Sequence, residues 1–187
     1  MTTTQPARKQ YTFDLSHSSV GFHVRHLMIS KVHGRFTSWT GSLEIDEADL
    51  GRSKVAVEID AASIDTKEPK RDEHLRSADF FDVEKFPKLT FASTAVEVVD
   101  DENLRVTGDL TIHGVTKSVV LEVERSAEVR DPWGNVRTGF SATTAISRKE
   151  FGLHWNAALE AGGVVVGDKV TIQLEIEAIL AAAAAAA

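Results

Sequence analysis

The chain of 187 residues contains no cysteine, which excludes disulfides, thiol nucleophiles and cysteine-ligated metals. No apolar run approaches the roughly 20 residues of a membrane-spanning helix. Lys and Arg number 21 against 28 Asp and Glu, so the clustered positive charge that binds nucleic acid is missing. The motifs GxSxG, HExxH and GxxxxGKS/T are absent as well. With 42% hydrophobic residues, the composition is typical of one soluble globular domain.

The two ends of the sequence differ from the part between them. Residues 1–10, MTTTQPARKQ, are polar and lack the apolar middle region of a secretory signal, so we interpret them as a flexible leader of a cytoplasmic protein. Residues 180–187 are dominated by alanine, and we interpret them as a disordered tail or a stretch whose side chains were never identified. The predicted folded domain therefore spans residues 11–179.

Between these ends, apolar and polar residues alternate with a period of two, which indicates strands with one apolar and one polar face. Ile172, Leu174 and Ile176 share one face of such a segment. The pattern predicts eight strands, at about 19–27, 31–45, 53–60, 88–99, 103–113, 116–130, 135–148 and 168–179. Because most are separated by short turns and have one polar face, we predict an all-β, eight-stranded antiparallel up-and-down β-barrel, with a two-sheet sandwich as the competing architecture.

Two long connections interrupt this succession of strands. Residues 61–87 contain the one convincing helix, for which Thr66 is the predicted cap, Pro69 suits the first turn and Leu75 faces inward. Residues 149–167 form the second connection. Both segments are rich in aromatic residues, so we expect them to fold over the barrel and to plug or line an opening.

Four histidines, His17, His23, His26 and His33, fall within one short segment. On an extended strand, His17 and His23 lie roughly 20 Å apart at ~3.3 Å per residue, too far to share an ion. His23 and His26 point to opposite faces, so only His26 and His33 would meet, across a hairpin that turns at Met28–Ile29. Two ligands fall short of the three or four that zinc takes. We predict no metal and no cofactor.

Four segments carry a resemblance to a known family: DLSHSSVGFHVRHLMISKVHGRF, ASIDTKEPKRDEHLRSADFFDVEKFPKLTF, GDLTIHGVTKSVVLEV and SRKEFGL. In this order they resemble the YceI-like family of lipid-binding proteins over nearly the whole predicted domain. The resemblance implies a lipocalin-like barrel whose elongated cavity holds an amphiphile, such as a polyisoprenoid or a fatty-acid-like lipid. Family members are often exported, whereas residues 1–10 carry no export signal.

The predicted ligand site combines strand faces with the aromatic connections. Nine phenylalanines against one tyrosine suggest an interior that needs bulk without hydroxyl groups, although plain core packing explains the same residues. The candidate apolar lining is Val20, Phe22, Val24, Phe36, Leu75, Phe80, Phe81, Phe86, Phe91, Leu110, Ile112, Phe140, Ile146, Phe151 and Trp155. Positions that match the family's motifs supply the candidate contacts to a lipid head group, which are His17, Arg25, His26, Arg71 and His74.

Three functions are compatible with these features. The leading hypothesis is non-catalytic binding, transport or sequestration of a long-chain amphiphile. The first alternative is a hydrolase or isomerase of a hydrophobic substrate that uses His74 with Asp72 or Asp79 as an acid–base pair. The second is an interaction module with a filled interior. The expected partner is a long-chain lipid, with no nucleic acid and no integral membrane insertion, and a homodimer is left open.

Overall fold

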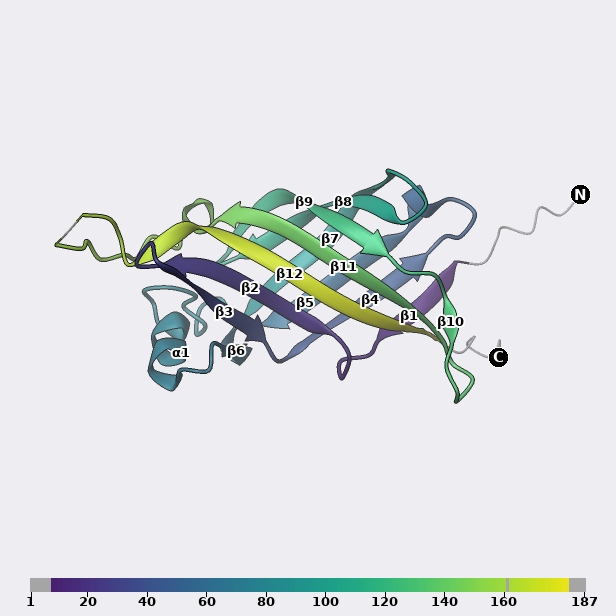
Figure 1. Ribbon diagram of the computed structural model, residues 1–187, viewed down its shortest axis with the longest axis horizontal. Helices are drawn as coiled ribbons and strands as arrows, with labels where there is room; N and C mark the ends of the chain where they lie inside the picture. The colour runs from purple at the N-terminus through teal and green to yellow at the C-terminus, as the bar shows by residue number, and fades with distance from the viewer. Residues whose placement is uncertain (1–7, 161, 182–187) are drawn as a thin grey trace, which may run out of the picture.

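The computed structural model describes residues 8–160 and 162–181. Most of the leader predicted at 1–10 and of the tail predicted at 180–187 therefore lies outside the described residues. The expected cytoplasmic location was based on that leader and stays a prediction. Figure 1 shows an elongated barrel of tilted strands with one short helix, α1, at one end. Among the described residues, no helix combines the length and the apolar character needed to cross a bilayer.

All pairings between the strands are antiparallel. The strands are β1 (Lys9–Phe13), β2 (Ser19–His26), β3 (Ser30–Phe36), β4 (Trp39–Ile45), β5 (Lys54–Asp60), β6 (Ile64–Asp65), β7 (Lys88–Val98), β8 (Asn103–Ile112), β9 (Val115–Arg125), β10 (Val129–Arg130), β11 (Val136–Ser147) and β12 (Val166–Leu180). The helices are α1 (Pro69–Arg76) and the short 3-10 turns Leu50–Arg52, Ala61–Ser63 and Arg148–Phe151.

The barrel closes through β12, which pairs with β11 along one side and with β1 and β2 along the other. The ring runs β12–β11–β9–β8–β7–β5–β4–β1 and back to β12. β1 and β2 lie end to end against β12, and β4 and β3 lie end to end against them. Each of these two end-to-end pairs occupies one strand position in the wall. The predicted eight-stranded antiparallel barrel is therefore confirmed.

The observed strands depart from the predicted ones in three places. β1 begins at Lys9 and pairs with both β4 and β12, so the first strand position starts inside the predicted leader. The predicted strand 31–45 is interrupted between Phe36 and Trp39, because β4 pairs with β5 while β3 diverges and pairs with the short β6. The predicted strand 116–130 ends at Arg125, and the separate β10 extends the sheet beside β11.

The helix is held by a buried polar network rather than by the predicted cap. Glu68, not Thr66, is the N-cap residue, and its carboxylate accepts the backbone N–H of Lys70 at 3.0 Å. Thr66 instead donates its backbone N–H to the buried carboxylate of Asp72 at 2.9 Å and accepts a hydrogen bond from Arg71 Nε at 2.7 Å. Because Thr66 precedes the helix, this network fixes α1 to the end of β6.

Candidate functional site

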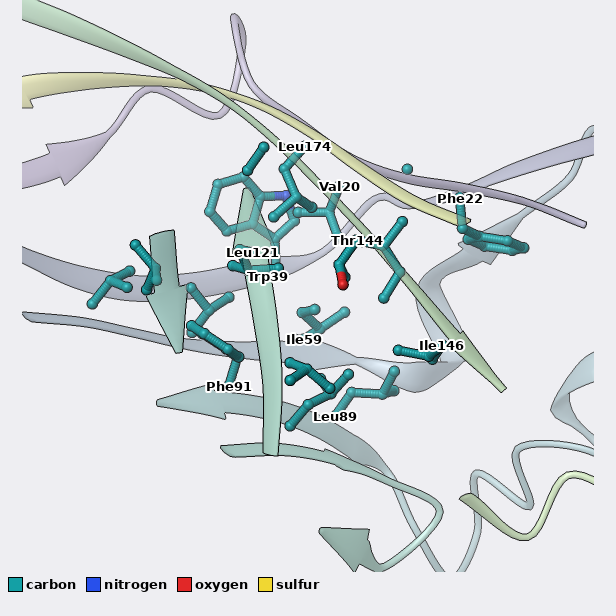
Figure 2. Close-up of a pocket in the computed structure, with 18 of the residues that line it drawn as sticks. Val20, Phe22, Trp39, Ile59, Leu89, Phe91, Leu121, Thr144, Ile146 and Leu174 are labelled. Carbon is teal, nitrogen blue, oxygen red and sulfur yellow. The ribbon is translucent and has the colours of Figure 1, made fainter. Parts of the chain in front are cut away.

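A cavity of about 280 Å³ runs through the inside of the barrel. Its wall is built from alternate residues of the strands, since every second side chain of a strand points to the same face. Figure 2 shows Val20, Ile59 and Leu174 directed into this space from three different strands. The volume lies near the lower end of the ~300–1,000 Å³ that ligand pockets usually occupy, so the cavity suits one slender apolar molecule.

Most of the predicted lining residues lie on the cavity wall. Those that do are Val20, Phe22, Val24, Phe36, Leu75, Phe80, Phe81, Phe91, Leu110, Ile112, Phe140, Ile146 and Phe151. Phe86 and Trp155 do not. Phe86 packs on His113 beside the β8–β9 turn, with ring centroids 4.6 Å apart, and Trp155 packs on His74 at 4.7 Å. Both rings hold loops together outside the cavity, which strand parity does not predict for residues in connections.

Several wall residues point inward and yet are only partly buried. Phe22, Phe91 and Ile146 belong to this group. Side chains in a packed interior touch neighbours on every side and leave few voids larger than a water molecule. The interior is therefore hollow, which speaks against the filled interior assumed for the interaction module.

The two long connections line one end of the cavity, as predicted. Leu75 of α1 and the following Phe80 and Phe81 contribute to the wall from the first connection. Phe151 and Leu153 contribute from the second connection, and both are buried. Both connections lie at the end of the barrel that carries α1 (Figure 1), and their apolar side chains complete the cavity wall there.

A few polar residues interrupt the apolar wall, and the sequence prediction missed them. They are Ser53, Lys54, Arg125, Thr144 and Arg148. Two of them could have been found by parity. Arg125 continues the inward series of Leu121 and Val123, and Arg148 follows the inward-facing Ile146 by two positions.

Arg148 is a buried cation whose N–H groups are used by the backbone. Its Nη1 donates to the carbonyls of Leu153 at 2.6 Å and of Trp155 at 2.8 Å, and its Nε donates to the carbonyl of Gly167 at 2.9 Å. Burial lowers the pKa of the guanidinium, while Asp168 acts in the opposite direction. Arg148 therefore fastens the second connection to the start of β12.

None of the five candidate head-group residues lies on the cavity wall. Arg71 directs its guanidinium to Thr66, and the ring of His74 packs between Phe80 and Trp155. Arg25 and His26 end β2, with Arg25 exposed. The family motif thus brings these residues to the barrel's outer surface or to its connections.

His17, the fifth of these residues, lies between β1 and β2 in an acidic group. Its Nδ1 is 2.9 Å from Asp14 Oδ2, and Glu177 completes a set of three potential metal ligands. Arg137 Nη1 donates to Asp14 at 2.7 Å and also contacts Glu177, so a guanidinium already bridges the two carboxylates. Hydrogen bonds from Ser16, His17 and Arg137 hold the pKa of Asp14 well below its usual range.

The hairpin register differs from the predicted one. The turn occupies Leu27–Ile29, so His26 faces Ser30 and His23 faces His33. The rings of His23 and His33 lie with their centroids 5.3 Å apart on the outer face. The expected juxtaposition of His26 with His33 is therefore wrong, because a turn centred on Met28 places His33, five residues after it, opposite His23, five residues before it.

Of the two acid–base pairs offered by the enzymatic alternative, the one between His74 and Asp79 is present. His74 Nε2 lies 2.9 Å from Asp79 Oδ2, whereas the carboxylate of Asp72 is buried and hydrogen-bonded to Thr66. A general base must lie within hydrogen-bond reach of its substrate. Neither His74 nor Asp79 borders the cavity.

Comparison with known proteins gives consistent relatives. A UPF0312 protein of Vibrio cholerae is 44% identical over 140 residues, which cover 74% of this chain and 73% of that protein. The crystal structure of the Campylobacter jejuni YCEI protein superposes with a TM-score of 0.73 at 34% identity, over 92% of this chain and 98% of the other. A polyisoprenoid binding domain from Saccharophagus degradans shares the fold, with a TM-score of 0.66 at 19% identity, over 91% of this chain and 98% of that domain.

The family model of the YceI-like domain matches residues 11–178. This range runs from β1 to β12 and includes both connections and the whole wall of the cavity. The chain belongs to the YceI-like family.

Proposed function

We propose that this protein binds a long-chain amphiphile, such as a polyisoprenoid or a fatty-acid-like lipid, inside the barrel and carries or sequesters it without chemical change. The observation that carries the proposal is the hollow, apolar-walled interior of about 280 Å³. The S. degradans domain with the same fold is described as polyisoprenoid binding, which supports a similar use of the barrel in this chain.

The apolar wall accounts for affinity for a lipid tail, but it gives little selectivity between hydrocarbon tails of different length. Burial of a methylene group contributes about 0.8 kcal/mol, so ten buried methylenes contribute roughly 8 kcal/mol, equivalent to a Kd near 1 μM before ordering costs are subtracted. Hydrocarbon tails that differ by one methylene are therefore poorly distinguished.

The head group is better placed near Lys54 and Arg125 than near the residues predicted from the sequence. Both cations border the cavity. Lys54 is the first residue of β5, whose other end leads through β6 to α1, and Arg125 is the last residue of β9. Arg125 Nη2 is 3.8 Å from Glu47, a distance too long for a hydrogen bond. An anionic head group at this end would gain charge-assisted hydrogen bonds that an alcohol would not.

The composition of the wall supports binding without catalysis. Within the described residues, no Asp, Glu or His borders the cavity, and these side chains perform most general acid–base catalysis. The alternative hydrolase or isomerase would have to bring its substrate to His74 outside the barrel.

Native mass spectrometry of protein purified without detergent tests the proposal. We expect a stoichiometric hydrophobic adduct, or uptake of one fluorescent long-chain fatty acid per protein when the adduct is removed. A protein that carries no adduct and takes up no such probe would refute the proposal. Turnover of a lipid ester or pyrophosphate that is lost in His74→Ala would establish the enzymatic alternative.

A further inference from the structure

The turn between β2 and β3 exposes apolar side chains. We call Leu27, Met28 and Ile29 the hairpin tip; Met28 is 59% exposed and Ile29 is 80% exposed. The turn lies at the end of the barrel that carries α1, where the loop before β12 extends beyond it (Figure 1). The second connection lies against the hairpin tip, since Leu27 donates its backbone N–H to the carbonyl of Val165 at 2.8 Å. A single exposed apolar residue is ordinary, whereas adjacent ones at an exposed turn require a reason.

The backbone of the hairpin tip is strained by the residues that form it. Leu27 and Met28 have φ angles of 51° and 59°, in the left-handed region that disfavours large side chains. Hairpin turns with two such residues usually contain Asn-Gly or Asp-Gly. The sequence thus keeps two bulky apolar residues where small polar ones would fold at lower cost, and strain of this kind is concentrated at functional sites.

Cations gather beside the hairpin tip. Arg25 faces Lys31 across the hairpin, and both are exposed on its outer side. Lys169 of β12 is exposed on the adjacent strand. Within the described part of the chain, no carboxylate lies within salt-bridge distance of these three residues, although the whole chain carries a net charge of -7. We call Arg25, Lys31 and Lys169 the basic rim.

The opposite end of the barrel provides a contrast. Val98 and Val99, at the turn between β7 and β8, are 50% and 51% exposed. They are followed by Asp100, Asp101 and Glu102. Exposed apolar residues therefore occur at both ends, but Val98 and Val99 are followed by carboxylates, whereas the hairpin tip stands beside cations.

We propose that the hairpin tip and the basic rim dock on an anionic lipid bilayer. Met28 and Ile29 would enter the boundary between head groups and acyl chains, while the basic rim would contact the anionic head groups. Apolar side chains flanked by Lys and Arg are the general pattern of proteins that bind a membrane interface. Docking in this orientation brings the α1 end of the barrel to the bilayer, and it goes beyond the proposed function because it does not require a filled cavity.

Flotation of the full chain with lipid vesicles tests docking. We expect binding to phosphatidylcholine vesicles that contain about 30% phosphatidylglycerol and much weaker binding to pure phosphatidylcholine, since each basic side chain near an anionic surface contributes roughly fivefold in affinity. Met28→Ser with Ile29→Ser should weaken binding at least tenfold. The matched control, Val98→Ser with Val99→Ser, removes a similar exposed pair at the other end and should bind like the parent protein.

A second variant separates docking from folding. Leu27→Asn with Met28→Gly supplies the residues that this turn prefers, so we expect a higher Tm together with weaker vesicle binding. Equal binding to the two kinds of vesicle, or unchanged binding of the Met28→Ser, Ile29→Ser variant, would overturn the proposal. Self-association of the parent protein that is lost in the Met28→Ser, Ile29→Ser variant would also overturn it, because the hairpin tip would then bind a second copy of the chain. Uptake of a fluorescent fatty acid should be unchanged in every variant, so a failure of docking leaves the proposed cavity binding intact.

Discussion

The replacement of Leu110 by Trp tests the interior of the barrel most directly. Leu110 lies on β8, where it faces Phe91 of β7 and Lys117 of β9, and its side chain borders the cavity. Trp has about six more side-chain heavy atoms than Leu. If they displace three methylenes of a bound chain, affinity falls by roughly 2.4 kcal/mol, or about 50-fold.

Stability distinguishes a hollow interior from a packed one. Overpacking of a filled core costs about 1–3 kcal/mol, which lowers Tm by roughly 2–4 °C per kcal/mol in a domain of this size. Because the cavity can receive the ring, we expect Leu110→Trp to melt within about 2 °C of the parent protein.

Two measurements on two variants decide the outcome. Thermal unfolding reports stability, and titration with a fluorescent long-chain fatty acid reports cavity binding. The neighbouring Asp109 is exposed, so Asp109→Trp places the same ring outside and should leave binding intact. A large loss of Tm in Leu110→Trp, or undiminished binding in that variant, would refute the reasoning.

Three further predictions concern the polar groups that hold the barrel and its connections. Arg148→Gln should cost about 3 kcal/mol or more in urea unfolding, because it leaves buried carbonyls such as that of Leu153 without donors; a loss below 1 kcal/mol would contradict the fastening role. Thr66→Val should lower the free energy of unfolding by about 1–3 kcal/mol by removing the hydroxyl between Asp72 and Arg71. Thr66→Ser keeps the hydroxyl and should retain most of that stability, so equal losses in both variants would contradict the role of the hydroxyl. The depressed pKa of Asp14 gives stability that is present above the ordinary carboxyl pKa of about 3.9 and is lost as the pH falls through the lower folded value. The difference in Tm between the parent protein and Asp14→Asn should therefore shrink from pH 6 to pH 3, and a constant difference would exclude this contribution.

Alternation predicted the barrel because most strands have one face on the cavity and one in water. It succeeded for β8, where Leu104, Val106 and Leu110 all border the cavity. It missed β1, whose five residues are recognisable as a strand only through their pairing with the distant β4 and β12. The interruption before Trp39 also depends on a remote cause, namely the divergence of β3 toward β6.

The same reasoning explains which site residues were predicted. Parity assigns a side to each strand residue, so Val20, Phe140 and Ile146 were placed correctly on the wall. Parity says nothing about connections, where Phe86 and Trp155 pack against histidines instead. The wall cations were missed because a charged residue was assumed to face water, although Arg148 satisfies its charge on backbone carbonyls inside the fold.

The role of β12 in closing the barrel has a consequence during synthesis. β1 pairs with residues such as Leu180, nearly the whole chain away, and β11 also needs β12 along its length. At ~5–20 residues per second, a ribosome takes on the order of ten seconds to reach β12 after β1 has emerged. The nascent chain spends that time with two open sheet edges and an uncovered apolar interior, which expose it to aggregation. Folding to the closed barrel therefore depends on the last strand, and such long-range pairing makes it slow.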